Sequence, residues 1–145
     1  MGWYLFDTSA YTHWNDLPEK WLRYRREFEA GRSRLILFEA LVFEAAAILA
    51  RSPGGEGAAT TMLESILRSP MAEYRRFEPK DLIQAAFVGG RLKSRKGYPR
   101  PPLSLVDRLC LAHASELKAR IVTTDPGLRD GARLLKIPVD WIAAF

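Results

Sequence analysis

The sequence has one cysteine and two histidines among its 145 residues. A single thiol excludes an internal disulfide, and Cys110 has no neighbouring cluster of ligands for a thiolate metal site. We therefore expect Cys110 to be a small buried hydrophobic residue. His13 and His113 are not spaced as a metal-binding pair, and we expect His113 to be a packed or surface imidazole. A P-loop and a GxGxxG motif are both missing, so no phosphate cradle is predicted.

Long apolar runs are also missing. None approaches the ~20 residues that span a bilayer, and the first residues, "MGWYLFDTSAY", lack the basic and apolar regions of a signal peptide. We therefore expect a cytoplasmic protein without a membrane partner. The length and the absence of repeats or linkers predict a single domain over residues 1–145. The net charge of +5 favours an anionic partner, with nucleic acid one possibility.

Apolar segments of strand type alternate with helical patterns along the whole chain. The strand-like segments are "WYLF", "RLILF", "EYRRF", "RIVTT" and "IPVDWI", and each is followed or preceded by a helical stretch. In the helix predicted to begin at Pro79, we expect Leu82, Ile83, Ala86 and Phe87 to face inward. This alternation predicts an α/β fold with a largely parallel sheet and right-handed crossovers.

Two aspartates directly follow predicted strands. Asp7 ends the first strand and Asp125 follows "RIVTT", so both are expected at the same carboxyl edge of the sheet. Hydroxyl groups of Ser9, Thr123 and Thr124 lie close by in sequence and can hydrogen-bond these carboxylates. Each aspartate also stands where a helix N-cap is expected, so capping alone is the alternative interpretation.

Glu44 lies on or beside an apolar helical face with Leu41, Ala45 and Ile48. A buried carboxylate is costly unless it is paired, hydrogen-bonded or bound to a metal, so Glu44 is expected to have a partner. An arginine from elsewhere in the chain is the ordinary alternative. Glu39 competes for the same role, but it stands at the helix entrance, where an acid simply complements the helix dipole.

Asp107 matches a capping box in which Ser104 caps the helix and Asp107 takes the third position. Cys110, Leu111 and Ala114 share its flank, so Asp107 also points toward the interior or toward an edge. Capping and metal binding are compatible here, because a carboxylate in the first helical turn is held rigidly.

Four acids on one edge would repel one another strongly unless a cation lay between them. Oxygen-only ligation favours Mg²⁺ or Mn²⁺. The sequence therefore predicts a divalent metal site. If each acid is instead a cap or an ion-pair partner, the same fold would serve as a non-catalytic module that binds RNA or a protein partner.

Four segments and a short closing one occur in the order of a known family. They are "FDTSA", "LVFEAAAIL", "LSLVDRLCLAHA", "IVTTDPGL" and "IPV". The chain resembles PIN-domain proteins, most of all the small prokaryotic VapC-type toxin ribonucleases. The resemblance implies a three-layer α/β/α fold with a mostly parallel sheet of about five strands. It also implies a metal-dependent endoribonuclease that is often a homodimer and is inhibited by a small VapB-like antitoxin.

The resemblance also implies roles for individual residues. Mg²⁺ or Mn²⁺ would be held by Asp7, Glu44, Asp107 and Asp125, with Ser9 and Thr124 as supports. The metal would orient and deprotonate a water and polarise the scissile phosphate of an RNA, leaving a 5′-phosphate and a 3′-hydroxyl.

The segment "GGRLKSRKGYPRPP" is long and basic. It offers an RNA-binding surface in which cationic side chains follow the phosphate backbone and a tyrosine stacks on a base. Its candidate residues are Arg91, Lys93, Arg95, Lys96, Tyr98 and Arg100. The alternative is a solvated helix end and loop.

Overall fold

The computed structural model describes residues 2–12, 18–98 and 103–143. The strands are β1 (Gly2–Phe6), β2 (Ser33–Phe38), β3 (Ala72–Arg75), β4 (Arg120–Thr123) and β5 (Val139–Trp141). The helices are α1 (Thr8–Thr12), α2 (Pro18–Glu29), α3 (Glu39–Ala50), α4 (Gly55–Leu67), α5 (Pro79–Lys93), α6 (Leu105–Leu117) and α7 (Pro126–Leu134). The predicted alternation of strands and helices is confirmed. Within the described ranges, no helix is both long and apolar enough to span a bilayer.

The five strands form one parallel sheet in the order β3-β2-β1-β4-β5. The chain runs outward from β1 to β2 and β3 on one side, and from β4 to β5 on the other. The order therefore reverses between β1 and β4, where Phe6 pairs with Val122. In open α/β sheets, ligands bind outside the strand carboxyl ends at this reversal. The fold thus puts its most favourable site where Asp7 and Asp125 follow their strands.

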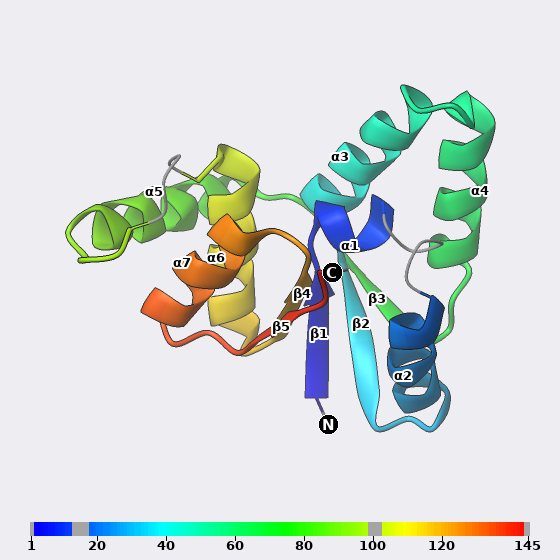
Figure 1. Ribbon diagram of the computed structural model, residues 1–145, viewed down its shortest axis with the longest axis horizontal. Coiled ribbons are helices and arrows are strands. Elements are labelled where there is room, and N and C mark those ends of the chain that lie inside the picture. Colours follow the sequence, from blue (N-terminus) through cyan, green and yellow to red (C-terminus); the bar gives the residue numbers. More distant parts are fainter. Residues whose placement is uncertain (1, 13–17, 99–102, 144–145) are drawn as a thin grey trace.

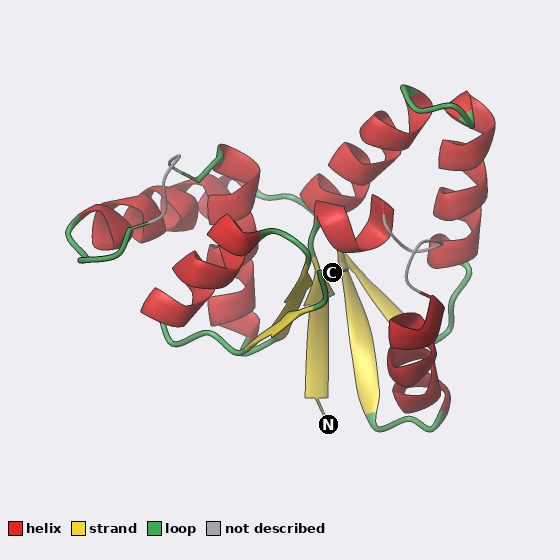
Figure 2. Cartoon of the chain, viewed as in Figure 1, coloured by secondary structure: helices red, strands yellow, loops and turns green. Residues whose placement is uncertain are grey.

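Helices cover both faces of the sheet (Figures 1 and 2). α6 and α7 lie on one side, with α5 beyond them, and α2 and α4 lie on the other. Phe6 at the end of β1 is fully buried, and its ring makes edge contacts with Tyr11 and Tyr24 at centroid distances of 5.8 and 5.6 Å. Cys110 is fully buried as a small hydrophobic residue, as predicted. The predicted three-layer α/β/α fold is confirmed.

The predicted inward face of α5 is wrong. Leu82, Ile83 and Phe87 are 45%, 55% and 54% exposed, and Ala86 is exposed as well. The helix instead buries Asp81, Ala85, Val88, Gly89 and Leu92. Two of these side chains are very small, which lets α6 come close: a Cβ on Gly89 would lie 3.2 Å from the Arg108 side chain. Close packing against α6 therefore buries the face with small side chains, and the face with larger apolar side chains stays exposed.

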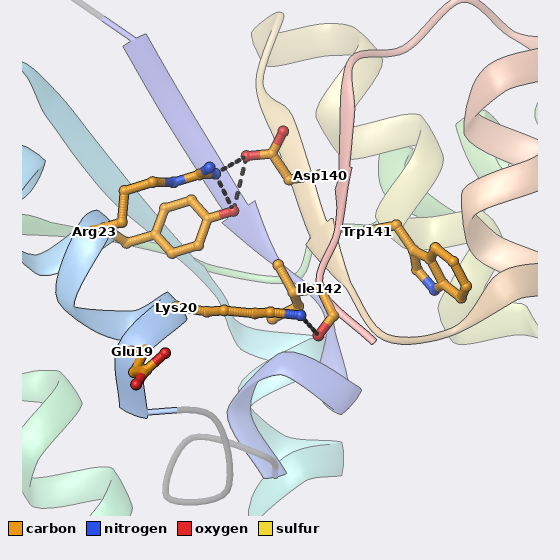
Figure 3. Close-up of a pocket in the computed structure, with 7 residues that line it drawn as sticks. Glu19, Lys20, Arg23, Asp140, Trp141 and Ile142 are labelled. Atoms are coloured by element: carbon orange, nitrogen blue, oxygen red, sulfur yellow. Dashed lines mark hydrogen bonds and ion pairs between the residues drawn. The ribbon is translucent and has the colours of Figure 1, made fainter. Parts of the chain in front are cut away.

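A polar network ties β5 to α2 (Figure 3). The Tyr24 hydroxyl donates to Asp140 Oδ2 at 2.8 Å, and Arg23 donates to the same oxygen at 3.0 Å. Arg120 donates to the other carboxylate oxygen at 3.2 Å. Nearby, Lys20 donates to the Ile142 carbonyl at 3.2 Å. These contacts fix the last strand beside β4, whose end carries Asp125.

We expect Tyr24→Phe to lower the free energy of unfolding by about 1 kcal/mol, the usual net worth of one hydrogen bond. The loss stays small because Asp140 keeps Arg23 and Arg120 as partners. Urea unfolding followed by circular dichroism would measure it. An unchanged midpoint would show that this hydroxyl contributes nothing to stability.

Candidate metal centre

Asp7 is the most firmly held carboxylate of the four predicted acids. It is 4% exposed and directly precedes α1. Its Oδ1 accepts hydrogen bonds from the Ser9 hydroxyl at 2.6 Å and from the Ala10 backbone N–H at 3.1 Å. Its Oδ2 accepts one from the Thr123 hydroxyl at 2.9 Å. All three donors are neutral, so they orient the carboxylate without balancing its charge.

Thr123 connects the two strand ends. Its hydroxyl donates to Asp7 and accepts from the Asp125 backbone N–H at 2.9 Å. The resemblance implied Thr124 as the support, whereas in the structure Thr124 contributes its backbone N–H, which donates to Ser9 Oγ at 2.9 Å. Successive side chains of a strand point to opposite faces, and here it is the Thr123 hydroxyl that reaches Asp7.

Asp125 and Asp107 are both engaged as helix caps. Asp125 Oδ1 accepts from the Gly127 backbone N–H at 2.9 Å, at the start of α7. Asp107 Oδ2 accepts from the Ser104 N–H at 3.2 Å, and the Ser104 hydroxyl accepts from the Asp107 N–H at 3.1 Å. The predicted capping box is present. Caps of this kind fix a carboxylate relative to its helix, which suits a metal ligand.

Electrostatic interactions join the four acids into one group. Burial raises the pKa of Asp7 from 3.8 to about 6, with the charge of Asp107 adding to the effect and the hydrogen bonds from Ser9, Ala10 and Thr123 opposing it. Burial also raises the pKa of Asp107, and the charges of Asp125 and Glu44 raise it further. Electrostatic repulsion thus acts between Asp107 and each of the other three acids.

Glu44 lies at the rim of this group and is only half-buried. α3 leaves this side chain beside a groove of about 470 Å³ rather than in the core, which agrees with a position beside the apolar helical face. Phe43 and Phe77 line the same groove. Glu39 accepts a hydrogen bond from the Tyr74 hydroxyl. Between the two glutamates, Glu44 is the one whose charge raises the pKa of Asp107.

The donor chemistry of this edge fits a hard divalent cation. Asp7, Glu44, Asp107 and Asp125 offer carboxylate oxygens, and among the described residues no lysine or arginine forms an ion pair with any of them. Mg²⁺ and Mn²⁺ prefer such oxygen ligands and retain several waters. A cation would offset the effects of burial and, to a smaller extent, of charge repulsion, which together raise the pKa of Asp7 and Asp107.

The family of this chain follows from a match that covers most of its sequence. The profile of the PIN domain matches residues 4–134. This chain belongs to the PIN domain family. No curated protein matches the sequence closely enough to count as a relative.

Solved structures share the fold of this PIN domain at low sequence identity. A chain of VapBC2 from Rickettsia felis, bound to a DNA fragment from their promoter, has a TM-score of 0.68 and 16% identity, over 95% of this chain and 97% of that chain. DNA-bound VapBC from Salmonella typhimurium gives 0.65 and 18%, over 97% and 98%. FitAcB from Neisseria gonorrhoeae gives 0.58 and 18%, over 94% and 95%. At these identities the likeness establishes the fold.

Five of the six predicted RNA-binding residues lie in the last turn of α5 or just after it, at the outer edge of the PIN domain (Figure 1). Arg91, Lys93, Arg95 and Lys96 are exposed there. Tyr98 is half-buried and packs against the hydrophobic core, so its ring is only partly available for stacking on a base. Arg100 lies outside the described residues.

One polar group of this PIN domain was missed from the sequence. His113 is packed as expected, with its ring stacked on Phe38 at 4.1 Å. Asp81, which received no role, is 4% exposed and lies beside it. The signal was available: Asp81 shares a helical face with Ala85 and Val88, so a helix that buries these residues also buries a carboxylate.

We expect Asp7→Asn to be more stable than the metal-free wild type at neutral pH. The folded-state pKa of Asp7 is raised from 3.8 to about 6, so the stability linked to its protonated form is present below pH 4 and is lost as the pH rises through 6. The neutral amide avoids this loss, which amounts to about 3 kcal/mol at most.

Denaturant unfolding of both proteins between pH 4 and pH 8, in chelator, would measure the difference. The advantage of Asp7→Asn should grow through this range and level off above pH 6. A pH-independent difference would mean that burial does not raise the pKa of Asp7.

Proposed function

We propose that this PIN domain is a Mg²⁺- or Mn²⁺-dependent endoribonuclease that acts as the toxin of a toxin–antitoxin system. The observation that carries the proposal is the group of acids at the β1/β4 strand reversal. Asp7 is buried there beside Asp107, and among the described residues its hydrogen-bond partners are two hydroxyls and a backbone N–H. Burying this charge costs free energy without a cation, whereas a bound divalent cation would offset that cost and activate a water.

Each acid would bind the metal from a different element. Asp7 and Asp125 are fixed at the ends of β1 and β4, and Asp107 is fixed in the first turn of α6. Glu44 on α3 stands at the open rim, where it can reach a metal or a bound water. A divalent ion supplies an activated water and charge stabilisation at a scissile phosphate. Ser9 and Thr123 would keep the Asp7 oxygens in one orientation throughout.

An RNA substrate would find two kinds of contact. The net charge of +5 and the exposed Arg91, Lys93, Arg95 and Lys96 favour a polyanion. Beside Glu44, the groove lined by Phe43 and Phe77 offers aromatic rings on which a single-stranded base can stack. Substrate would thus lie across the acids with its bases toward α3. The cytoplasmic location expected from the sequence makes cytoplasmic RNA the proposed substrate.

Metal-dependent cleavage separates this proposal from its alternative. With purified protein and single-stranded RNA, we expect cleavage in Mn²⁺ or Mg²⁺ and none in excess chelator. Asp7→Asn and Asp107→Asn should each reduce the rate at least ~100-fold, because a lost metal ligand costs no less than a lost supporting contact. The products should carry 5′-phosphate and 3′-hydroxyl ends.

Asp130→Asn is the matched control, because Asp130 pairs with Arg129 on α7 and is not one of the four acids. It should cleave like the wild type. Mn²⁺ should also raise the melting temperature of the wild type but not that of Asp7→Asn. If RNA is bound but never cleaved, with or without metal, the chain is instead a non-catalytic RNA-binding module.

Protein partners form the remaining part of the proposal. The likeness to chains of VapBC and FitAcB assemblies supports a small antitoxin partner. A homodimer is proposed as well, from the sequence motifs that resemble VapC-type toxins. For the homodimer we propose the outward face of α5, where Leu82, Ile83 and Phe87 are about half exposed. Three large exposed apolar side chains close together on one helix are typical of an interface rather than of a free surface.

Ile83→Asp should convert a dimer into a monomer, because the charge would be buried at the contact. Light scattering after size exclusion would give the mass. Thr60→Asp, on the exposed face of α4, adds the same charge elsewhere and should leave the mass unchanged. A wild type that is already monomeric, or an Ile83→Asp protein that stays dimeric, would exclude this face as the dimer contact.

A further inference from the structure

A second group of possible metal ligands lies where α5 packs on α6, away from the four acids. Asp81, His113 and Glu116 each direct a ligand atom to one place, and these atoms all lie within 4.8 Å of one another. His113 and Glu116 are one helical turn apart on α6, and Asp81 lies in the first turn of α5. Six residues, about 9 Å of helix, separate His113 from Asp107 on α6. The two groups are therefore distinct.

His113 is the unexplained member of the group. It is 7% exposed, and neither ring nitrogen has a hydrogen-bond partner among the residues that the structure describes. Asp81 Oδ1 is 3.8 Å from His113 Nδ1, which is too long for a hydrogen bond. Buried polar atoms without partners are rare, and a bound ion is one of the few explanations for them. Burial also lowers the pKa of His113, so the ring is neutral and can donate a lone pair.

The carboxylates of Asp81 and Glu116 are also placed where they can act as ligands. Asp81 Oδ2 accepts a hydrogen bond from the Glu78 backbone N–H at 2.7 Å, which orients the carboxylate and leaves Oδ1 toward His113. Glu116 is exposed and at present pairs with the Lys80 ammonium at 3.2 Å. The three residues border a cavity of about 260 Å³, which leaves room for an ion and its water.

The ligand types select the ion. Three carboxylates border the cavity and would repel an anion, although Arg75, Arg76 and Lys80 border it as well. One imidazole with two carboxylates suits Zn²⁺, whereas Mg²⁺ prefers an octahedron of oxygens. Ligand atoms of a tetrahedral zinc site lie about 3.3 Å apart, so the group needs to close by up to roughly 1.5 Å. The exposed Glu116 side chain can supply most of that movement.

We propose that Asp81, His113 and Glu116 form a Zn²⁺ site that fastens the start of α5 to the end of α6. Zn²⁺ displaces the Lys80 ammonium from Glu116 and takes a water as its fourth ligand. It gives His113 the partner that it lacks. The site does not depend on the acids at the strand ends, so it stands or falls separately from the nuclease proposal.

The histidine ring gives a direct measurement. The chain has two histidines, so the ring signals of ¹⁵N-labelled protein are few, and a His13→Gln variant assigns them. Titration with ZnCl₂, in excess Mg²⁺ to occupy the oxygen-only site, should shift the His113 ring signals and saturate at one equivalent. Unshifted His113 signals would overturn the proposal and would indicate a buried water in its place.

Two surface variants separate a metal site from an ion-pair network. Glu116→Gln and Lys80→Gln both remove the Lys80–Glu116 pair, but only the first removes a ligand. We expect Glu116→Gln to weaken Zn²⁺ binding at least ~10-fold in calorimetry, and Lys80→Gln to leave it unchanged or tighten it. Asp81→Asn, which can still accept from the Glu78 N–H, should weaken it as well. Equal effects of Glu116→Gln and Lys80→Gln would overturn the proposal.

Discussion

The buried charge of Asp7 is the constraint around which the rest of the site is arranged. Its carboxylate lies between the ends of β1 and β4, and in the described part of the chain its hydrogen-bond partners are two hydroxyls and one backbone N–H. Hydrogen bonds orient an anion and lower its energy, but burial and the neighbouring Asp107 outweigh them, since the pKa still rises to about 6. The protein thus holds a carboxylate whose charged form the described residues stabilise only in part.

Thr123 shows how the backbone makes this arrangement rigid. One hydroxyl joins the carboxylate at the end of β1 to the backbone of Asp125 after β4, so the two strand ends cannot separate without breaking it. The parallel pairing of Phe6 with Val122 sets their register. Asp125 then caps α7 with the same carboxylate that faces the acid group. Capping and the proposed metal binding therefore use the same geometry, because an N-cap holds its side chain at the strand's carboxyl end.

Much of this was predictable because the sequence determines it locally. Strand ends followed by Asp7 and Asp125 indicate the active edge of a parallel sheet, and the Ser104–Asp107 box is visible in four residues. The rest depends on packing partners that are far apart in the chain. Nothing local shows which face of α5 packs on α6, because both faces carry apolar residues. The failure to foresee Asp81 beside His113 has the same cause.

The two groups of polar residues, one at each end of α6, differ in the types of ligand atom that they offer. Its first turn presents Asp107 to other carboxylates, and its later turns present His113 and Glu116 to Asp81. The first group is all oxygen and repels itself, which suits a hard ion that keeps its waters and exchanges. The second contains an imidazole held by stacking on Phe38, which suits an ion bound by fixed ligands. Because the ligand types differ, Mg²⁺ is a poor competitor for the group that contains the imidazole, and an excess of Mg²⁺ over Zn²⁺ would keep Mg²⁺ at the all-oxygen group, so that a single helix could serve both proposed sites.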